Sequence, residues 1–174
     1  ADLIAAGTKL TSIAETGTIS TVALTAAQYS TTLTAKFSNF TATVSGVAAA
    51  NAATVLTNTK VASIAVSDTA ANLATNLNAL QTAGTKLTTI TNADNGVLSI
   101  TVTQLTADAT ALAKINGGIY SLNVTAVTAA GTATVIANTH VVGFLVTDTA
   151  ANIRVAANLT ALINAGSKLV SITE

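Results

Sequence analysis

The side chains with the clearest capacity for chemistry are three aspartates at the boundaries of predicted elements. Asp68 and Asp148 each separate an apolar strand pattern from a helical pattern, and Asp94 opens an Asp-Asn-Gly turn. A side-chain oxygen at a helix start accepts a bond from an unpaired helix N–H, so we predict that Asp68 and Asp148 are N-caps. The alternative role is calcium binding, with Asp94, Asp68 and Asp148 as weak candidates, because the Gly/Asp-rich nonapeptide of calcium-binding β-rolls is absent.

The remaining reactive residue types are too sparse to assemble a catalytic centre. His140 is the single histidine, cysteine is absent, and the seven acidic residues are scattered along the chain. A nucleophile needs a neighbouring base, and a phosphate site needs a glycine-rich loop, but neither motif is present. We therefore expect no enzymatic activity, no catalytic residue, no bound metal and no cofactor.

Three glycines each follow a helical pattern and precede a lysine by two positions. Gly7, Gly84 and Gly166 all lie within an Ala-Gly-Thr/Ser-Lys-Leu block. Glycine readily adopts the left-handed conformation that closes many helices, so we predict that these three residues are C-terminal helix caps. The lysines would then lie beside helix C-termini, where a positive charge is mildly favourable.

The composition restricts the classes of partner. Half of the 174 residues are hydrophobic, only 8% are charged, and seven basic residues balance seven acidic ones. A neutral chain provides no electrostatic footprint for nucleic acid, and no apolar stretch approaches the ~18 residues of a membrane span. We expect neither a nucleic-acid partner nor a membrane span. The chain begins at Ala1 without a recognisable signal peptide, and we expect it to be a mature or excised part of something longer.

One sequence block returns almost unchanged later in the chain. The segment VASIAVSDTAANL at 61–73 reappears as VVGFLVTDTAANI at 141–153, which gives a period of about 80 residues. This period predicts one continuous solenoid over residues 1–174, with approximate units 9–85 and 86–167 and partial unit ends 1–8 and 168–174. The predicted fold class is α/β, a repeat solenoid of strand-plus-short-helix coils with a mainly parallel sheet.

Alternation of apolar and polar residues predicts which strand faces are buried. Helical patterns are expected at about 105–115, 128–138 and 149–165, and a strand at 168–173. Segments 86–91 and 97–103 lack a helix between them, so they form either a hairpin or a strand-only coil. The side chains expected to face the helices are those of Leu98, Ile100, Val102, Leu122, Val124, Phe144 and Val146. Those expected to face away are Ser99, Thr101, Ser121, Asn123 and Thr125.

These blocks together resemble the tandem repeats of very large bacterial secreted and cell-surface proteins. The resemblance rests on Val-Ser/Thr-Asp-Thr-Ala-Ala-Asn-Leu/Ile at 66–73 and 146–153, on the leucine-rich helix that follows, and on Ala-Gly-x-Lys-Leu-x-x-Ile. The segments 24–28 and 44–51 resemble other parts of the same repeats. The resemblance implies an adhesin-like, biofilm-matrix or surface-layer role outside the bacterial cell, and it carries over no catalytic residue. The low acidity departs from the calcium-rich members.

The two ends of the predicted solenoid carry near-copies of one strand, at Leu10–Ala14 and Leu169–Thr173. We assign Leu10, Ile13, Leu169 and Ile172 as assembly edges, because no polar capping segment is recognisable. The chain is therefore predicted to stack head to tail with itself into an open filament, or to continue as part of a longer repeat chain. A module that binds surface glycans is the alternative. Ice binding through Thr-x-Thr ladders is disfavoured because the ladder is poorly repeated.

Overall fold

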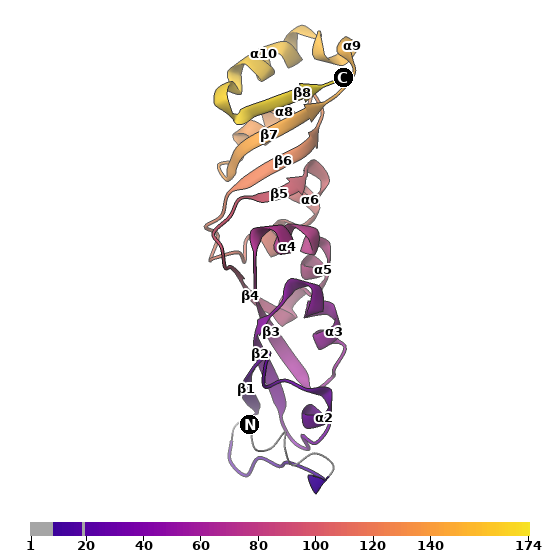
Figure 1. Cartoon of the computed structure of the whole chain (residues 1–174), viewed down its shortest axis with the longest axis vertical. Helices are drawn as coiled ribbons and strands as arrows, with labels where there is room; N and C mark the ends of the chain where they lie inside the picture. Colours follow the sequence, from indigo (N-terminus) through magenta and orange to yellow (C-terminus); the bar gives the residue numbers. More distant parts are fainter. Residues whose placement is uncertain (1–8, 19) are drawn as a thin grey trace.

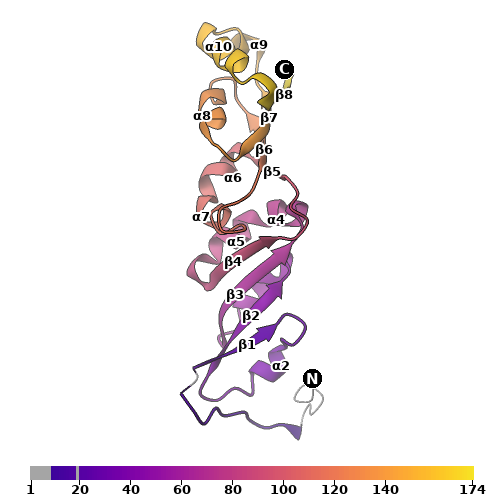
Figure 2. The ribbon, with the colours of Figure 1, turned by 90° about the vertical axis from the view of Figure 1, so that its left-hand side faces the viewer.

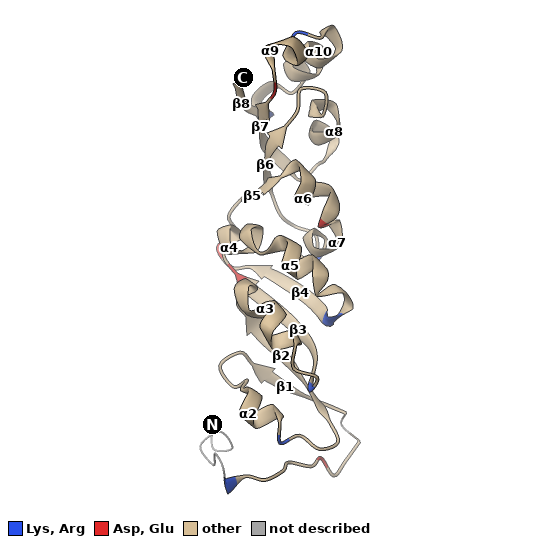
Figure 3. Cartoon of the chain, turned by 90° about the vertical axis from the view of Figure 1, so that its right-hand side faces the viewer, with Lys and Arg blue, Asp and Glu red and all other residues tan. Residues whose placement is uncertain are grey.

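The computed structural model describes residues 9–18 and 20–174, and these form an elongated column (Figure 1). Two four-stranded parallel sheets follow one another along the column, with strand orders β1-β2-β3-β4 and β5-β6-β7-β8. The predicted alternation of parallel strands with helices is thus confirmed. The views in Figures 2 and 3 place strands β5 to β8 along one side of the column and helices α6, α7 and α8 along the other.

The first sheet and its helices occupy one half of the column. Their elements in chain order are β1 (Thr21–Thr25), α2 (Thr31–Thr34), β2 (Thr41–Val47), η2 (Ala49–Asn51), α3 (Ala52–Leu56), β3 (Val61–Asp68), α4 (Ala70–Thr75), α5 (Leu77–Thr82), η3 (Gly84–Lys86) and β4 (Leu87–Asn92). The predicted strand near Leu10–Ala14 is reduced to a single parallel bridge between Ile13 and Phe37.

The second sheet occupies the other half. Its elements are β5 (Leu98–Thr101), α6 (Val102–Ala107), α7 (Ala109–Leu112), β6 (Leu122–Val127), α8 (Thr132–Ala137), β7 (Val141–Thr147), α9 (Ala150–Ile153), α10 (Ala156–Asn164), η4 (Gly166–Lys168) and β8 (Leu169–Thr173). The helix expected at 149–165 is therefore two helices, with a break at Arg154 and Val155.

The predicted inward faces of the strands are buried, with one exception. At most 1% of each side chain is exposed for Leu98, Ile100, Leu122, Val124, Phe144 and Val146. Val102 was also expected on this strand face, but it is the first residue of α6 and is only half-buried. The strand ends early because Thr101 and Gln104 form a capping box that starts the helix.

The outward prediction is right for Ser99 and Thr101, which are exposed. Ser121, Asn123 and Thr125 are half-buried. Thr125 Oγ1 donates a hydrogen bond of 3.2 Å to the carbonyl oxygen of Ile100. Part of this polar face thus forms side-chain contacts between the neighbouring strands β5 and β6.

Segments 86–91 and 97–103 do not form a hairpin. β4 is the last strand of the first sheet and β5 is the first strand of the second. Residues 114–116, which follow α7, join the two sheets through β4. Ile90 N donates to Lys114 O at 3.1 Å, and Asn116 N donates to Ile90 O at 2.8 Å. The apolar core therefore runs on from one sheet to the other, with Leu77, Ile90, Leu112 and Ile115 all at most 2% exposed.

Both sheets contain an irregularity at the same place in the strand order. The register of β2 on β3 shifts between Val44 and Val47, and that of β6 on β7 shifts between Val124 and Val127. The chain takes up the extra residue with a positive φ, +68° at Gly46 and +56° at Ala126. These shifts are β-bulges, which bend a strand locally.

Candidate functional site

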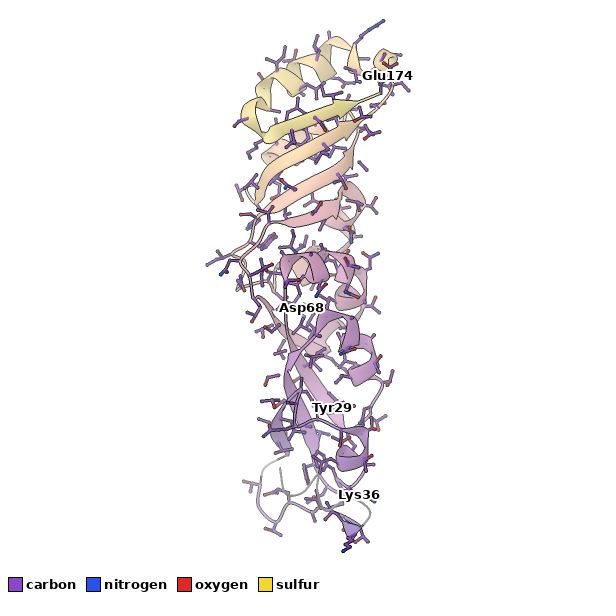
Figure 4. The ribbon with its side chains drawn as sticks, viewed as in Figure 1. Tyr29, Lys36, Asp68 and Glu174 are labelled. Atoms are coloured by element: carbon purple, nitrogen blue, oxygen red, sulfur yellow. The ribbon has the colours of Figure 1, made fainter. Side chains whose placement is uncertain are left out.

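Asp68 lies at the end of β3, midway along the column (Figure 4), and it binds two neighbouring elements. Its Oδ1 accepts hydrogen bonds from Thr69 N at 2.9 Å and Asn72 Nδ2 at 2.6 Å, and its Oδ2 accepts one from Ala49 N at 2.9 Å. The predicted N-cap is wrong by one residue, since Thr69 has the cap conformation and its side chain accepts from Asn72 N. Asp68 instead joins the start of α4 to the short helix η2.

Asp148 makes the same set of contacts in the second sheet. Its carboxylate accepts from Thr149 N at 2.8 Å, Asn152 Nδ2 at 2.7 Å and Ala129 N at 2.9 Å. Here too the N-cap is the following residue, Thr149, and not the aspartate. The side-chain amide of Asn152 and the backbone donors stabilise the ionised form, so the pKa of Asp148 lies below its ordinary value.

Asp94 also binds backbone rather than forming a carboxylate cluster. Its Oδ1 accepts from Ala70 N and from Gly96 N, both at 3.0 Å, and these bonds lower its pKa. Within residues 9–18 and 20–174, no three acidic or histidine side chains gather in a way that could hold a metal ion. Asp68 and Asp94 accept from the adjacent N–H groups of Thr69 and Ala70 at the start of α4, and Asp148 accepts from Thr149 N in the second sheet.

The predicted glycine caps have the backbone geometry that this role needs. Gly84 has φ +56° and follows α5, and Gly166 has φ +53° and follows α10. Each opens a short 3-10 turn that ends in a lysine, Lys86 or Lys168. Gly7 lies outside the described residues.

His140 serves the packing of a loop. Its ring stacks on the ring of Tyr120 with centroids 4.0 Å apart, and its Nδ1 lies 3.2 Å from the carbonyl oxygen of Tyr120. Tyr120 also lines a surface hollow with Asn92, Asn95 and Asn116. This hollow combines an aromatic ring with several amide groups.

Asp108 is a buried acid that the sequence did not single out. It lies between α6 and α7 with 3% of its surface exposed, and its Oδ2 has no hydrogen-bond partner within the described part of the chain. Burial raises its pKa, because a desolvated carboxylate is less stable than the neutral acid. An acid within a helical pattern is usually exposed, so the spacing of Ala107, Asp108 and Ala109 gave no signal of burial.

The predicted assembly edges lie in different surroundings. Leu10, Ile13 and Leu169 are partly buried, and Ile172 is 45% exposed. Together with other apolar residues Ile172 forms a surface at the C-terminal end of the column, here called the α10/β8 face. Its exposed members are Val155, Leu159, Ile163 and Ile172.

The equivalent surface in the middle of the column is covered. Leu77 of α5 and Ile90 of β4 occupy the same places as Leu159 and Ile172, but their exposed fractions are 0% and 1%. Helices α6 and α7 pack on α5, and β5 packs on α4. The α10/β8 face therefore has the residue types that are buried, in the middle of the column, against the next layer of helix and strand.

No family model, no curated protein and no solved structure matches the chain. Over the described residues, every helix is too short or too polar to cross a bilayer.

Proposed function

We propose that this chain is a non-enzymatic structural protein that forms or extends an extracellular bacterial filament, sheath or adhesin by head-to-tail stacking. The observation that carries the proposal is the contrast between two matching surfaces. Leu159 and Ile172 are 46% and 45% exposed, whereas Leu77 and Ile90 in the same places are at most 1% exposed. A large exposed apolar surface marks an interaction site.

The proposal includes a solenoid architecture with a period of about 80 residues. It is supported by the matching hydrogen bonds of Asp68 and Asp148 and by the matching bulges at Gly46 and Ala126. In a solenoid each layer buries its apolar surface only against its neighbours, so an uncapped end favours addition of a further layer. A zero net charge leaves little electrostatic repulsion between copies.

A location outside the bacterial cell, at the cell surface or in a biofilm matrix, is part of the same proposal. It is supported by the resemblance of the Asp-Thr-Ala-Ala-Asn blocks to repeats of secreted proteins and by the threonine-rich, charge-poor surface. The partner is another copy of the same chain, or the continuation of a longer repeat chain. The proposal involves no catalytic residue, metal or cofactor.

The test is the assembly state of the purified chain at micromolar concentration, measured by sedimentation and negative-stain microscopy. Wild-type protein is expected to sediment as filaments. Ile163→Asp places a charge in the α10/β8 face, where the side chain is 71% exposed, and should leave a folded monomer.

Val142→Asp is the matched control, because Val142 is 50% exposed but lies on β7, away from the end of the column. It should assemble like wild type. A wild-type chain that stays monodisperse and monomeric, with no longer parent chain, would contradict the proposal.

A second candidate function is the binding of surface glycans. The hollow lined by Tyr120, Asn95 and Asn116 favours it, because small-molecule sites combine aromatic side chains with a few polar groups such as asparagine amides. A glycan array probed with the monomeric Ile163→Asp variant separates this function from assembly. Binding by that monomer would support a glycan-binding module, and its absence would remove the candidate.

A further inference from the structure

We propose that copies of this chain join by strand exchange, in which residues 169–174 of one copy replace residues 9–15 of the next copy. The acceptor is the segment Lys36–Asn39, here called the acceptor edge. This inference rests on the proposed head-to-tail assembly and specifies its contact. Lys36 and Glu174 lie near opposite ends of the column (Figure 4), so the exchange would extend the column along its length.

Within one chain the acceptor edge is occupied by residues 9–15. Ile13 N donates to Lys36 O at 2.7 Å, and Ser38 N donates to Ile13 O at 3.0 Å. Glu15 N donates to the side chain of Asn39 at 2.9 Å, and the Asn39 amide donates back to Glu15 O at 2.8 Å. The segment is thus held by one parallel bridge and by the side chain of Asn39.

The same contacts recur where the two sheets meet, and there the strand belongs to the preceding sheet. Ile90 N donates to Lys114 O, Asn116 N donates to Ile90 O, and Asn92 N donates to Asn116 Oδ1 at 3.0 Å. Ile90 and Lys114 correspond to Ile13 and Lys36. Asn116 makes both the backbone contact that Ser38 makes and the side-chain contact that Asn39 makes. This junction shows how the last strand of one sheet occupies an edge of the acceptor type.

The C-terminal strand has the sequence and the register that this position needs. Residues 165–174 are AGSKLVSITE, against AGTKLTSIAE at 6–15. Ile172 pairs with Val146 of β7 as Ile90 pairs with Val66 of β3. A second copy placed as at the junction would therefore bring Ile172 to its Lys36–Ser38 backbone. Glu174 takes the place of Glu15, so the residue type at this position is unchanged.

The side chains of the α10/β8 face and of the acceptor side are compatible with a second copy placed as at the junction. At the junction Gln81 Oε1 accepts from Ala111 N at 2.8 Å. In the α10/β8 face the Gln81 position is the apolar Ile163. On the acceptor side the Ala111 position is Leu33, whose N–H is already bonded to Ser30 Oγ at 3.0 Å. Ile163 would therefore leave no backbone donor unpaired.

A lysine contact fits as well. Lys114 Nζ donates to the carbonyl oxygens of Gly84 and Leu87 across the junction. Lys36 occupies the Lys114 position on the acceptor edge, and Gly166 and Leu169 would supply the two carbonyl oxygens. The helix C-terminus to which Gly166 belongs favours a cation at this place.

Residues 9–15 bury little surface, so displacing them costs little free energy. Leu10, Ile13 and Glu15 are only partly buried, and the other described residues of the segment are exposed. By contrast Leu87, Ile90 and Asn92 of β4 are each at most 4% exposed. Exchange conserves the backbone hydrogen bonds and adds the burial of the α10/β8 face, which favours the exchanged arrangement.

The test uses paired cysteines, which the natural chain lacks entirely. Ala14 and Ser38 are exposed neighbours on the two paired segments, and Thr173 corresponds to Ala14. Ala14→Cys with Ser38→Cys should form a disulfide within one chain, because neighbouring strands lie within bridging distance. Ser38→Cys with Thr173→Cys, oxidised after assembly, should instead give a ladder of covalent multimers on a non-reducing gel.

The first pair also acts as a lock. Oxidised before assembly, the Ala14→Cys/Ser38→Cys protein should form no filaments by negative-stain microscopy, and reduction should restore them. A third pair, Ala14→Cys with Thr173→Cys, reports stacking without exchange. Filaments that form from the locked protein, or a ladder from the third pair alone, would overturn strand exchange and leave head-to-tail assembly standing. Absence of filaments in the reduced proteins and in wild type would overturn both.

Discussion

Individual carboxylates in this protein have opposite effects on its stability. Asp68 and Asp148 each accept three hydrogen bonds, and the resulting low pKa means that both stabilise the fold above their ordinary pKa of 3.8. This stabilisation is lost as the pH falls through the lowered folded-state values. Asp108 is the reverse case, since it is buried without a partner for Oδ2 and its pKa is raised.

We predict that Asp108→Ala raises the free energy of unfolding at pH 7 by about 1 kcal/mol, because it removes an unpaired buried charge. In the wild-type chain the raised pKa means that stability increases as the pH falls through the folded value towards 3.8. The advantage of the variant should shrink over the same range. Urea unfolding at pH 7 and pH 4 measures both effects, and a variant less stable than wild type at pH 7 would contradict the assignment.

At the scale of elements, the strands were more predictable than their ends. The alternation of apolar and polar residues placed Leu98, Ile100, Leu122 and Val124 in the core, because burial against helices selects apolar residues at every second position. It extended β5 too far, since Val102 continues the alternation while the capping residues Thr101 and Gln104 turn the chain into a helix. Local hydrogen bonding decided this boundary against periodicity.

Contacts between distant segments explain what the sequence could not show. The joining of the two sheets depends on Ile90 meeting Lys114 and Asn116, a contact that no local pattern encodes. The burial of Asp108 depends in the same way on how α6 and α7 pack. The Ala-Gly-x-Lys blocks, in contrast, located Gly84 and Gly166 at left-handed positions because glycine preference is a local property.

The bulge in β6 gives a prediction at the same scale. Ala126 has φ +56°, a region in which a Cβ atom is unfavourable, whereas Gly46 occupies the equivalent place in β2. Ala126→Gly should therefore stabilise the protein by about 1 kcal/mol, and Gly46→Ala should destabilise it by a similar amount. Thermal and urea unfolding check both changes, and a loss of stability in Ala126→Gly would show that the alanine conformation carries no strain.

On the scale of the whole molecule, the strands of each sheet follow one another along the column (Figure 1). Copies joined through β8 would continue this succession. We predict that aligned filaments give a diffraction reflection at about 4.8 Å along the filament axis, the spacing of hydrogen-bonded strands. Fibre diffraction from aligned filaments measures it, and a reflection of that spacing across the axis instead would exclude this arrangement.

The orientation of the strand ladders also determines how the column would respond to tension. Since strands succeed one another along the column, a pull on its two ends would load the bonds between neighbouring strands a few at a time instead of all together. The layer at a free end would peel first, and each released strand and helix would lengthen the chain before the next layer yielded. Such a fibre would extend in small steps at modest force. It would shorten to its original length when the layers refold.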